Sequence, residues 1–273
     1  MQQHRELTHM DVSSGSRPDA DPAVPQVQST FGRTEKASRR NFSVMLIDAI
    51  GYFVGISFFS PQTTLQEFVT RLTTSNVLIG LTTSIAWGGM TLTQLFVANY
   101  VGRLPIKKWY VVLFGAFERL PLLVCAIVTP ILAKPHPMAM LVVVFALLAA
   151  QYLFMGCILP SYSALYSKVI PPRQRGLLFG SGIGVANVLK LGTGLLIPFM
   201  LVADRWWGGF PNGFALCFLI GFIVLVASYI PLAFADEPRE AGPAQRTSQR
   251  EYARALWRIL RHERDFQLFA VFG

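Results

Sequence analysis

The stretch NYVGRLPIKKWY, residues 99–110, places three basic side chains between two strongly apolar segments. The apolar segments cover residues 77–98 and 109–132. Each is close to the length of about 20 residues that a helix needs to cross a bilayer core of about 30 Å, at about 1.5 Å per residue. Lys and Arg gather in short loops at the membrane surface. The stretch therefore predicts a surface loop between two transmembrane helices.

The same alternation of apolar and polar segments continues along the chain. Apolar runs occupy residues 42–60, 77–98, 109–132, 138–160, 177–203 and 213–235. None shows the strict polar alternation of a membrane β-barrel strand. The chain is 52% hydrophobic and 14% charged, with a mean hydropathy of +0.44, whereas soluble domains carry about 25% charged residues. We expect an all-α membrane protein, a polytopic transmembrane helix bundle with six spans over residues 42–235.

The positions of Lys and Arg predict how the helices are oriented. The segments before the first, third and fifth apolar runs are basic, and they contain Arg33, Lys36, Arg39, Arg40, Arg103, Lys107, Lys108, Lys168, Arg173 and Arg175. The intervening segments contain only Arg71, Lys134 and Arg205. Because cytoplasmic loops carry the excess of Lys and Arg, we expect a multi-pass protein of the cytoplasmic (inner) membrane with a cytoplasmic amino terminus.

The net charge of +9 has the same explanation. The basic residues lie in short loops and are not interleaved with aromatic residues on a helix that could enter a nucleic-acid groove. We therefore expect membrane lipids as partners, anionic ones at the inner leaflet, and no nucleic acid. The cysteines lie inside apolar runs and the histidines are scattered, so no metal site, cofactor or catalytic cluster is predicted.

The segments that flank the six apolar runs are mainly polar up to residue 264. Residues 1–41 are rich in Ser, Pro, Gln and Asp and are expected to form a disordered cytoplasmic tail. Residues 236–264 are expected to form a cytoplasmic linker. Within it, EYARALWRILRHER (251–264) predicts a basic amphipathic helix on the inner leaflet, with a plain solvated helix as the alternative. The run DFQLFAVFG (265–273) is the expected start of a truncated seventh span.

Three stretches resemble a known family. LTTSNVLIGLTTSIAWGG (72–89) is similar to the beginning of the second helix of major facilitator superfamily transporters. The stretch 99–110 occupies the place of the family's loop between helices two and three, and PPRQRGLLFGSGIG (171–184) is similar to the passage from helix four to helix five. Over residues 42–273 the chain resembles the amino-terminal six-helix half of such a transporter. The missing carboxy-terminal half of the same protein is then an expected partner.

The loop between the second and third runs departs from the family's typical pattern, Gly-x-x-x-Asp-Arg-x-Gly-Arg-Arg or Lys. If Gly102 and Arg103 take the Gly-Arg positions, Asn99 stands where the Asp is expected. If Lys107 and Lys108 take the final basic pair, Arg103 stands there instead. In both alignments the acid is missing, and with it the charge pair that connects the two halves in the family. A basic contact of this loop to lipid or to helix ends stays open.

The resemblance implies a secondary active transporter that moves a small solute by alternating access, with proton coupling as a hypothesis. One alternative is a non-transporting polytopic sensor or assembly protein. Another is a membrane-embedded enzyme. The loops contain no cluster of His, Asp or Cys suited to catalysis, so we expect that the protein is not an enzyme.

Four ionisable residues lie inside the predicted spans, namely Asp48, Glu118, Arg119 and Lys190. A charge at the bilayer centre costs about 2.5–3.5 kcal/mol on insertion scales, so such side chains face a cavity or one another. Asp48 lies about 9 Å from the inner edge, and the others about 13–20 Å. Sequence neighbours point to different faces of a helix, so Glu118 is expected to pair with Lys190 rather than with Arg119. Asp48 would then pair with Arg119, with the exchanged pairing also open.

By the resemblance, these four residues are candidates for solute binding and coupling. Asp48 or Glu118 is the expected proton-linked carboxylate. Arg119 or Lys190 is expected to attract an anionic group of the solute or to balance the carboxylate.

Polar and small residues within the runs complete the candidates. Gln94 and Gln151 are candidates for solute contact or for a hydrogen bond between helices. Two Gly-x-x-x-Gly steps occur, Gly51 with Gly55 and Gly180 with Gly184. Such steps let helix backbones approach closely, so both are expected to lie at helix contacts.

Overall fold

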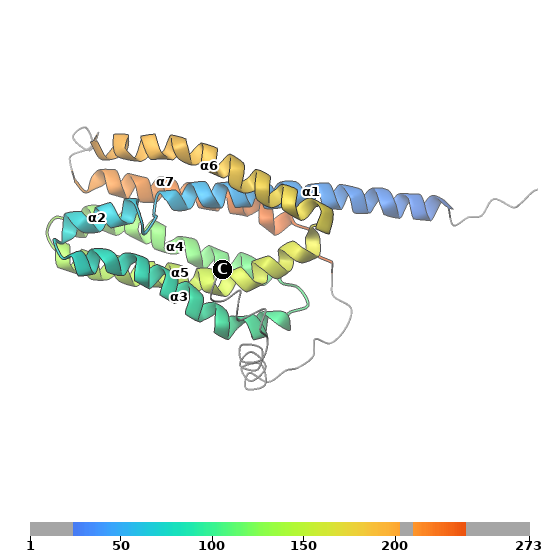
Figure 1. Cartoon of the computed structure of the whole chain (residues 1–273), viewed down its shortest axis with the longest axis horizontal. Coiled ribbons are helices and arrows are strands. Elements are labelled where there is room, and N and C mark those ends of the chain that lie inside the picture. Colours follow the sequence, from blue (N-terminus) through green and yellow to red (C-terminus); the bar gives the residue numbers. More distant parts are fainter. Residues whose placement is uncertain (1–23, 203–209, 239–273) are drawn as a thin grey trace, which may run out of the picture. The chain divides into compact units, whose positions relative to one another are not determined.

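The computed structural model describes residues 24–202 and 210–238. These residues form helices joined by short turns (Figure 1). In chain order the helices are α1 (Val24–Ser57), α2 (Thr64–Leu72), α3 (Asn76–Gly102), α4 (Lys108–Leu132), α5 (Pro137–Val169), α6 (Pro172–Val202), α7 (Asn212–Tyr229) and the short 3₁₀ helix η2 (Ile230–Phe234). The described residues contain no strand, which confirms the all-α prediction.

Among the described residues, four helical segments are long and apolar enough to cross a membrane. They are α4, α5, α6 and the segment Asn212–Phe234, which consists of α7 and η2. The predicted spans at residues 42–60 and 77–98 lie in α1 and α3, which are long but less apolar. The first half of α1 is polar, and α3 is rich in Thr, Ser and Asn. A multi-pass helical membrane protein is therefore confirmed, and the count of six spans stays a prediction.

Helix α1 begins inside the segment that was predicted to be a disordered tail. Residues 24–41 are helical, and Pro25 stands in the first turn, where its missing N–H is not needed. The chain divides into two compact units after Ala37, and everything described below belongs to the unit from Ser38. Residues 1–23 and 239–273 lie outside the described residues, as do the predicted amphipathic helix and seventh span.

A short helix that the apolar runs did not predict lies between α1 and α3. In α2, Leu65, Phe68 and Val69 are buried, while Glu67 and Arg71 on the opposite face form an ion pair at 3.0 Å. The helix is thus amphipathic, with one face toward the core. A search for long apolar runs misses it because only one side of a nine-residue helix is apolar.

The core lies around α5, which packs against both α3 and α4, while α4 also packs against α7. Near α2, the rings of Phe59 and Phe68 both contact Phe218, with centroids 5.1 and 5.5 Å apart. Toward the other end of α4, Val111 is fully buried in a second apolar cluster. The charged pair at 118–119 lies on α4 between Val111 and Leu122, which belongs to the first cluster.

Helix α6 is the least covered of the four apolar segments. Only 17% of its most apolar window is buried, against 44% for α4. Leu191, Leu195 and Phe199 are largely exposed. An apolar face of this kind is stable against lipid or against further helices of a larger membrane protein.

The two glycine steps have different surroundings. A Cβ atom at Gly55 would lie 2.7 Å from Leu225 Cγ on α7, and one at Gly51 would overlap Ser228, so α1 and α7 approach closely there. At Gly180 and Gly184 a Cβ atom would meet nothing within 4 Å among the described residues. The expected helix contact at this second step is therefore not present in the described part of the chain.

Candidate functional site

A cluster of three buried charges lies between α1 and α4. Asp48 comes from α1, and Glu118 and Arg119 come from α4. Their exposed fractions are 4%, 2% and 3%, respectively. Charged side chains are rarely buried to this degree unless they are paired, so the contacts of each decide what the cluster can do.

Arg119 is held by backbone oxygens and by an aromatic ring. Its Nε donates to the Leu225 carbonyl at 3.1 Å and its Nη1 to the Gly115 carbonyl at 2.7 Å. The guanidinium carbon lies 3.7 Å from the ring centroid of Tyr229, a favourable cation–π position. Any Cβ at Gly115 would overlap the Tyr229 ring, so glycine at 115 allows this stacking.

Glu118 is paired with its neighbour in sequence. Arg119 Nη1 donates to Glu118 Oε2 at 3.0 Å, and the Tyr52 hydroxyl donates to Oε1 at 3.0 Å. The expected pair of Glu118 with Lys190 is wrong. The long Arg119 side chain folds back over its own helix toward the carbonyl of Gly115, one turn earlier, and this brings it to the carboxylate beside it.

Arg119 binds Asp48 less closely than it binds Glu118. Asp48 Oδ1 lies 3.9 Å from Arg119 Nη2, at the outer limit of an ion pair, and has no hydrogen-bond partner within the described part of the chain. The expected pairing of Asp48 with Arg119 is thus present, but only as a long contact. One guanidinium faces two carboxylates, and it binds Glu118 more closely.

The cluster lines a cavity of about 400 Å³. Besides the three charges, the polar residues of the lining all carry hydroxyl groups, and most of the remaining wall is apolar. They are Tyr52, Tyr162, Ser163, Tyr166 and Tyr229. A low-dielectric wall with a few converging polar groups is typical of a ligand or ion site. We call this space the ion cavity.

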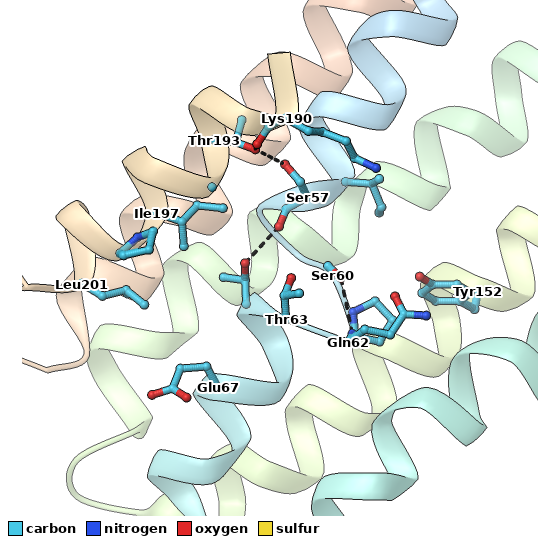
Figure 2. Close-up of a pocket in the computed structure, with 15 residues that line it drawn as sticks. Ser57, Ser60, Gln62, Thr63, Glu67, Tyr152, Lys190, Thr193, Ile197 and Leu201 are labelled. Carbon is cyan, nitrogen blue, oxygen red and sulfur yellow. Dashed lines mark hydrogen bonds between the residues drawn. The ribbon is translucent and has the colours of Figure 1, made fainter. Parts of the chain in front are cut away.

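Lys190 lies in a second space, the pocket shown in Figure 2. Its Nζ lies 5.6 Å from the ring centroid of Phe53, and no carboxylate of the described residues forms an ion pair with it. The pocket has a volume of about 590 Å³ and lies between the end of α1, the start of α2, Tyr152 on α5 and one side of α6.

Hydroxyl groups line the pocket where α1 ends. Ser57 Oγ lies 3.1 Å from Thr193 Oγ1, which donates to the Lys190 carbonyl at 3.0 Å. Thr64 Oγ1 donates to the Ser57 carbonyl at 2.9 Å, which satisfies one of the free carbonyls of the last turn of α1. These bonds connect α1, α2 and α6 around Lys190 (Figure 2).

Gln94 and Gln151 do not line either space. Gln94 is half-buried on α3. Gln151 is 1% exposed on α5, and neither its Oε1 nor its Nε2 has a hydrogen-bond partner among the described residues. The structure therefore does not bring these two residues together with the charged candidates.

The loop between α3 and α4 lacks the acidic residue of the family pattern, but an acidic residue from elsewhere in the chain binds it. Glu237, just after η2, accepts hydrogen bonds from the backbone N–H groups of Lys107 at 2.9 Å and Lys108 at 2.7 Å, at the start of α4. Its Oε1 also pairs with Lys168 Nζ at 2.9 Å. The Glu237 side chain is 1% exposed. A carboxylate in this position caps the N-terminus of the helix and interacts favourably with the positive end of the helix dipole.

The other residues of the loop lie around this contact. Gly102 is the last residue of α3 and has open space at its Cβ position, and Arg103 follows as the cap. Lys108 Nζ donates to the carbonyls of Ala233 and Ala235 at 3.1 and 3.0 Å. The loop thus makes the basic contact to helix ends that the sequence left open. The partner Glu237 could not be found by a motif, because it lies 130 residues from Lys107.

Comparison with known proteins identifies the class. Ionisable residues buried between membrane helices are typical of functional sites. A sequence model of the Major Facilitator Superfamily matches residues 42–273, and the chain belongs to that family. No curated protein and no solved structure gives a significant match. No group of three or more metal-ligating side chains occurs within the described residues.

Proposed function

We propose that this chain is part of a proton-coupled secondary transporter that moves a small solute across the cytoplasmic membrane by alternating access. Membership of a transporter family supports transport in general. The observation that supports proton coupling is the composition of the ion cavity. Two buried carboxylates share one guanidinium.

The charges of the cluster do not balance. Asp48, Glu118 and Arg119 together carry one negative charge when both carboxylates are ionised. An uncompensated buried charge costs several kcal/mol. Lys190 does not contribute, because it lies in the pocket of Figure 2. One further positive charge is therefore required in the ion cavity, and a proton is the smallest cation that can enter it.

Asp48 is the carboxylate that fits this role. Glu118 has both oxygens occupied, by Tyr52 and by Arg119, whereas Asp48 Oδ1 has no hydrogen bond to any residue that the structure describes. With a proton on Asp48, Arg119 would be left to Glu118, and its shorter contact to Glu118 supports this. Without the proton, Arg119 has to serve both carboxylates.

The proton would thereby change the balance of attraction between α1 and α4. A change in bound charge shifts a conformational equilibrium only if the two states hold that charge differently. Asp48 and Arg119 lie on different helices and are 3.9 Å apart, so their separation differs whenever α1 moves relative to α4. This is the coupling that alternating access requires.

The placement in the membrane is part of the proposal. The basic segments alternate along the chain, which supports a cytoplasmic amino terminus, and Glu237 with its lysines would then lie at the cytoplasmic end of the bundle. Anionic lipids of the inner leaflet and the remainder of the protein are the partners we propose.

Thiol accessibility tests the proposal without a known solute. In the complete protein, with Cys125, Cys157 and Cys217 replaced by Ala, a single cysteine is placed at Ser60 in the pocket or at Ile183 beside the ion cavity. We expect a fall in pH to change labelling by an impermeant maleimide in opposite directions at the two positions.

The matched variant is Asp48→Asn, which should abolish this pH response. Opposite changes in wild type that persist in Asp48→Asn would place the coupling proton elsewhere. Labelling that never depends on pH, or that rises and falls together at both positions, would refute proton-coupled alternating access and favour a non-transporting membrane protein.

A further inference from the structure

The pocket of Figure 2 is lined by Lys190, whose positive charge takes no part in the proposed proton site at Asp48. We propose that this pocket binds the solute, and that the solute is a small monocarboxylate with an apolar body, whose carboxylate lies against Lys190. This inference rests on the proposed function, since it names the class of solute that the transporter moves.

The charge of the pocket favours an anion. Lys190 is half-buried and has no acidic partner among the described residues. The other charged residue of the lining, Glu67, is already bound by Arg71, with Nε at 3.1 Å and Nη2 at 3.0 Å from Oε1. The pocket therefore offers an unopposed positive charge, and a half-buried cation attracts an anion more strongly than an exposed one.

Of the hydroxyl groups of Ser57, Ser60 and Thr193, that of Ser60 is left as a donor. The proton of Thr193 is directed to the Lys190 carbonyl and that of Ser57 to the Val54 carbonyl, at 3.0 and 2.5 Å. Ser60 Oγ accepts from the Gln62 N–H at 3.4 Å and keeps its own proton for donation. Lys190 and Ser60 both line the pocket, and a carboxylate has two oxygens that can accept from an ammonium and from a hydroxyl group.

The rest of the wall is apolar. Ile56, Ile197, Pro198 and Leu201 line the pocket beyond the polar groups, and Figure 2 shows Ile197 and Leu201 following one another along α6 below Thr193. The volume of about 590 Å³ lies in the range of small-molecule sites. An inorganic anion would leave this wall without contact, whereas an apolar body attached to the carboxylate would cover it.

Calorimetric titration tests the inference on the protein in lipid nanodiscs. The probes are benzoate, its neutral isostere benzamide, and inorganic phosphate. We expect benzoate to bind at least about tenfold more tightly than benzamide, because a charge-assisted hydrogen bond is lost with the amide. Phosphate should bind more weakly than benzoate, since it has no apolar body. This comparison uses the unsubstituted protein alone, so its result does not depend on whether a variant folds.

Variants locate the binding. Lys190→Gln should weaken benzoate binding about tenfold or more, and Lys190→Arg should retain most of it. Lys134→Gln is the matched control, because Lys134 is exposed on the α4–α5 turn outside the pocket. Equal binding of benzoate and benzamide, tighter binding of phosphate, no benzoate binding, or full affinity in Lys190→Gln would each overturn the inference.

The two proposals can fail separately. The thiol experiment reads the response to protons through Asp48 and uses no solute. The titration reads equilibrium binding through Lys190 at constant pH. Loss of the pH response with Lys190-dependent benzoate binding intact would refute the coupling alone, and the reverse result would refute the solute class alone.

Discussion

Replacing Glu237 tests the contact that binds the start of α4. In Glu237→Ala, the N–H groups of Lys107 and Lys108 lose their acceptor, and Lys168 loses its carboxylate. Loss of a helix cap costs about 0.5–2 kcal/mol. The ion pair is nearly buried, with side-chain exposure of 11% for Lys168 and 1% for Glu237, and breaking a fully buried pair costs about 3–5 kcal/mol. Because Lys168 stays partly exposed, we take about half of the pair cost, and with the cap we expect a combined loss of about 2–4.5 kcal/mol in the free energy of unfolding.

The adjacent acid provides the matched control. The side chain of Asp236 is 57% exposed and pairs with Arg40, which is also exposed. Its two bonds to Asn41 use only backbone atoms of Asp236, so Asp236→Asn keeps them. We expect a loss under about 1 kcal/mol for Asp236→Asn.

Unfolding in mixed micelles, by stepwise addition of a denaturing detergent, gives the two free energies under the same conditions. Glu237→Gln should fall between Glu237→Ala and wild type, because the amide oxygen can still accept the backbone N–H groups but carries no charge. If Glu237→Ala is no less stable than Asp236→Asn, Glu237 does not hold the loop and the reasoning is wrong.

The remaining predictions use the same unfolding assay. Gly55→Ala should destabilise the bundle by about 1–3 kcal/mol, because its Cβ would lie 2.7 Å from Leu225 Cγ. Gly184→Ala should instead stabilise it by about 0.5–1 kcal/mol, because a Cβ at this position has open space. Equal effects of the two substitutions would refute the difference between the two glycine steps. Gln151→Leu should stabilise by about 1–3 kcal/mol, because it removes a buried amide without partners; a loss of stability would show that the amide binds a group outside the described residues. Arg119→Gln should cost about 3–5 kcal/mol at neutral pH. Its deficit should shrink as the pH falls, because protonation neutralises the two carboxylates left behind, and a deficit independent of pH would contradict the charge balance of the ion cavity.

The fold could be predicted from the sequence to the extent that it depends on apolar length. Runs of about 20 apolar residues require helices in lipid, since every backbone polar group has to be satisfied within the segment. The short helix α2 could not be found in this way, because its stability comes from Leu65, Phe68 and Val69 facing a core that exists only after folding. The polar composition of residues 1–41 was interpreted as a sign of disorder, and α1 begins within them at Val24.

The candidate site could be predicted only in part. The position of a residue along a run gives its depth, which correctly singled out Asp48, Glu118 and Arg119 as charges that need partners. Depth does not give the rotation of one helix relative to another, so nothing in the sequence placed Lys190 in a different space from Glu118. The pairing of Glu118 with Arg119 depends on the absence of a side chain at Gly115, which lets Arg119 fold back beside Tyr229.

Infrared difference spectroscopy at Asp48 tests the proton site most directly. The carbonyl stretch of a protonated carboxylic acid is separate from the bands of carboxylates, so spectra of the protein in nanodiscs at several pH values report whether a buried acid carries a proton. We expect one such band in wild type that disappears as the pH rises, that is absent in Asp48→Asn, and that remains in Glu118→Gln and in the exposed control Glu67→Gln. A band that persists in Asp48→Asn, or no band in wild type at any pH, would contradict a proton on Asp48 and with it the proposed coupling.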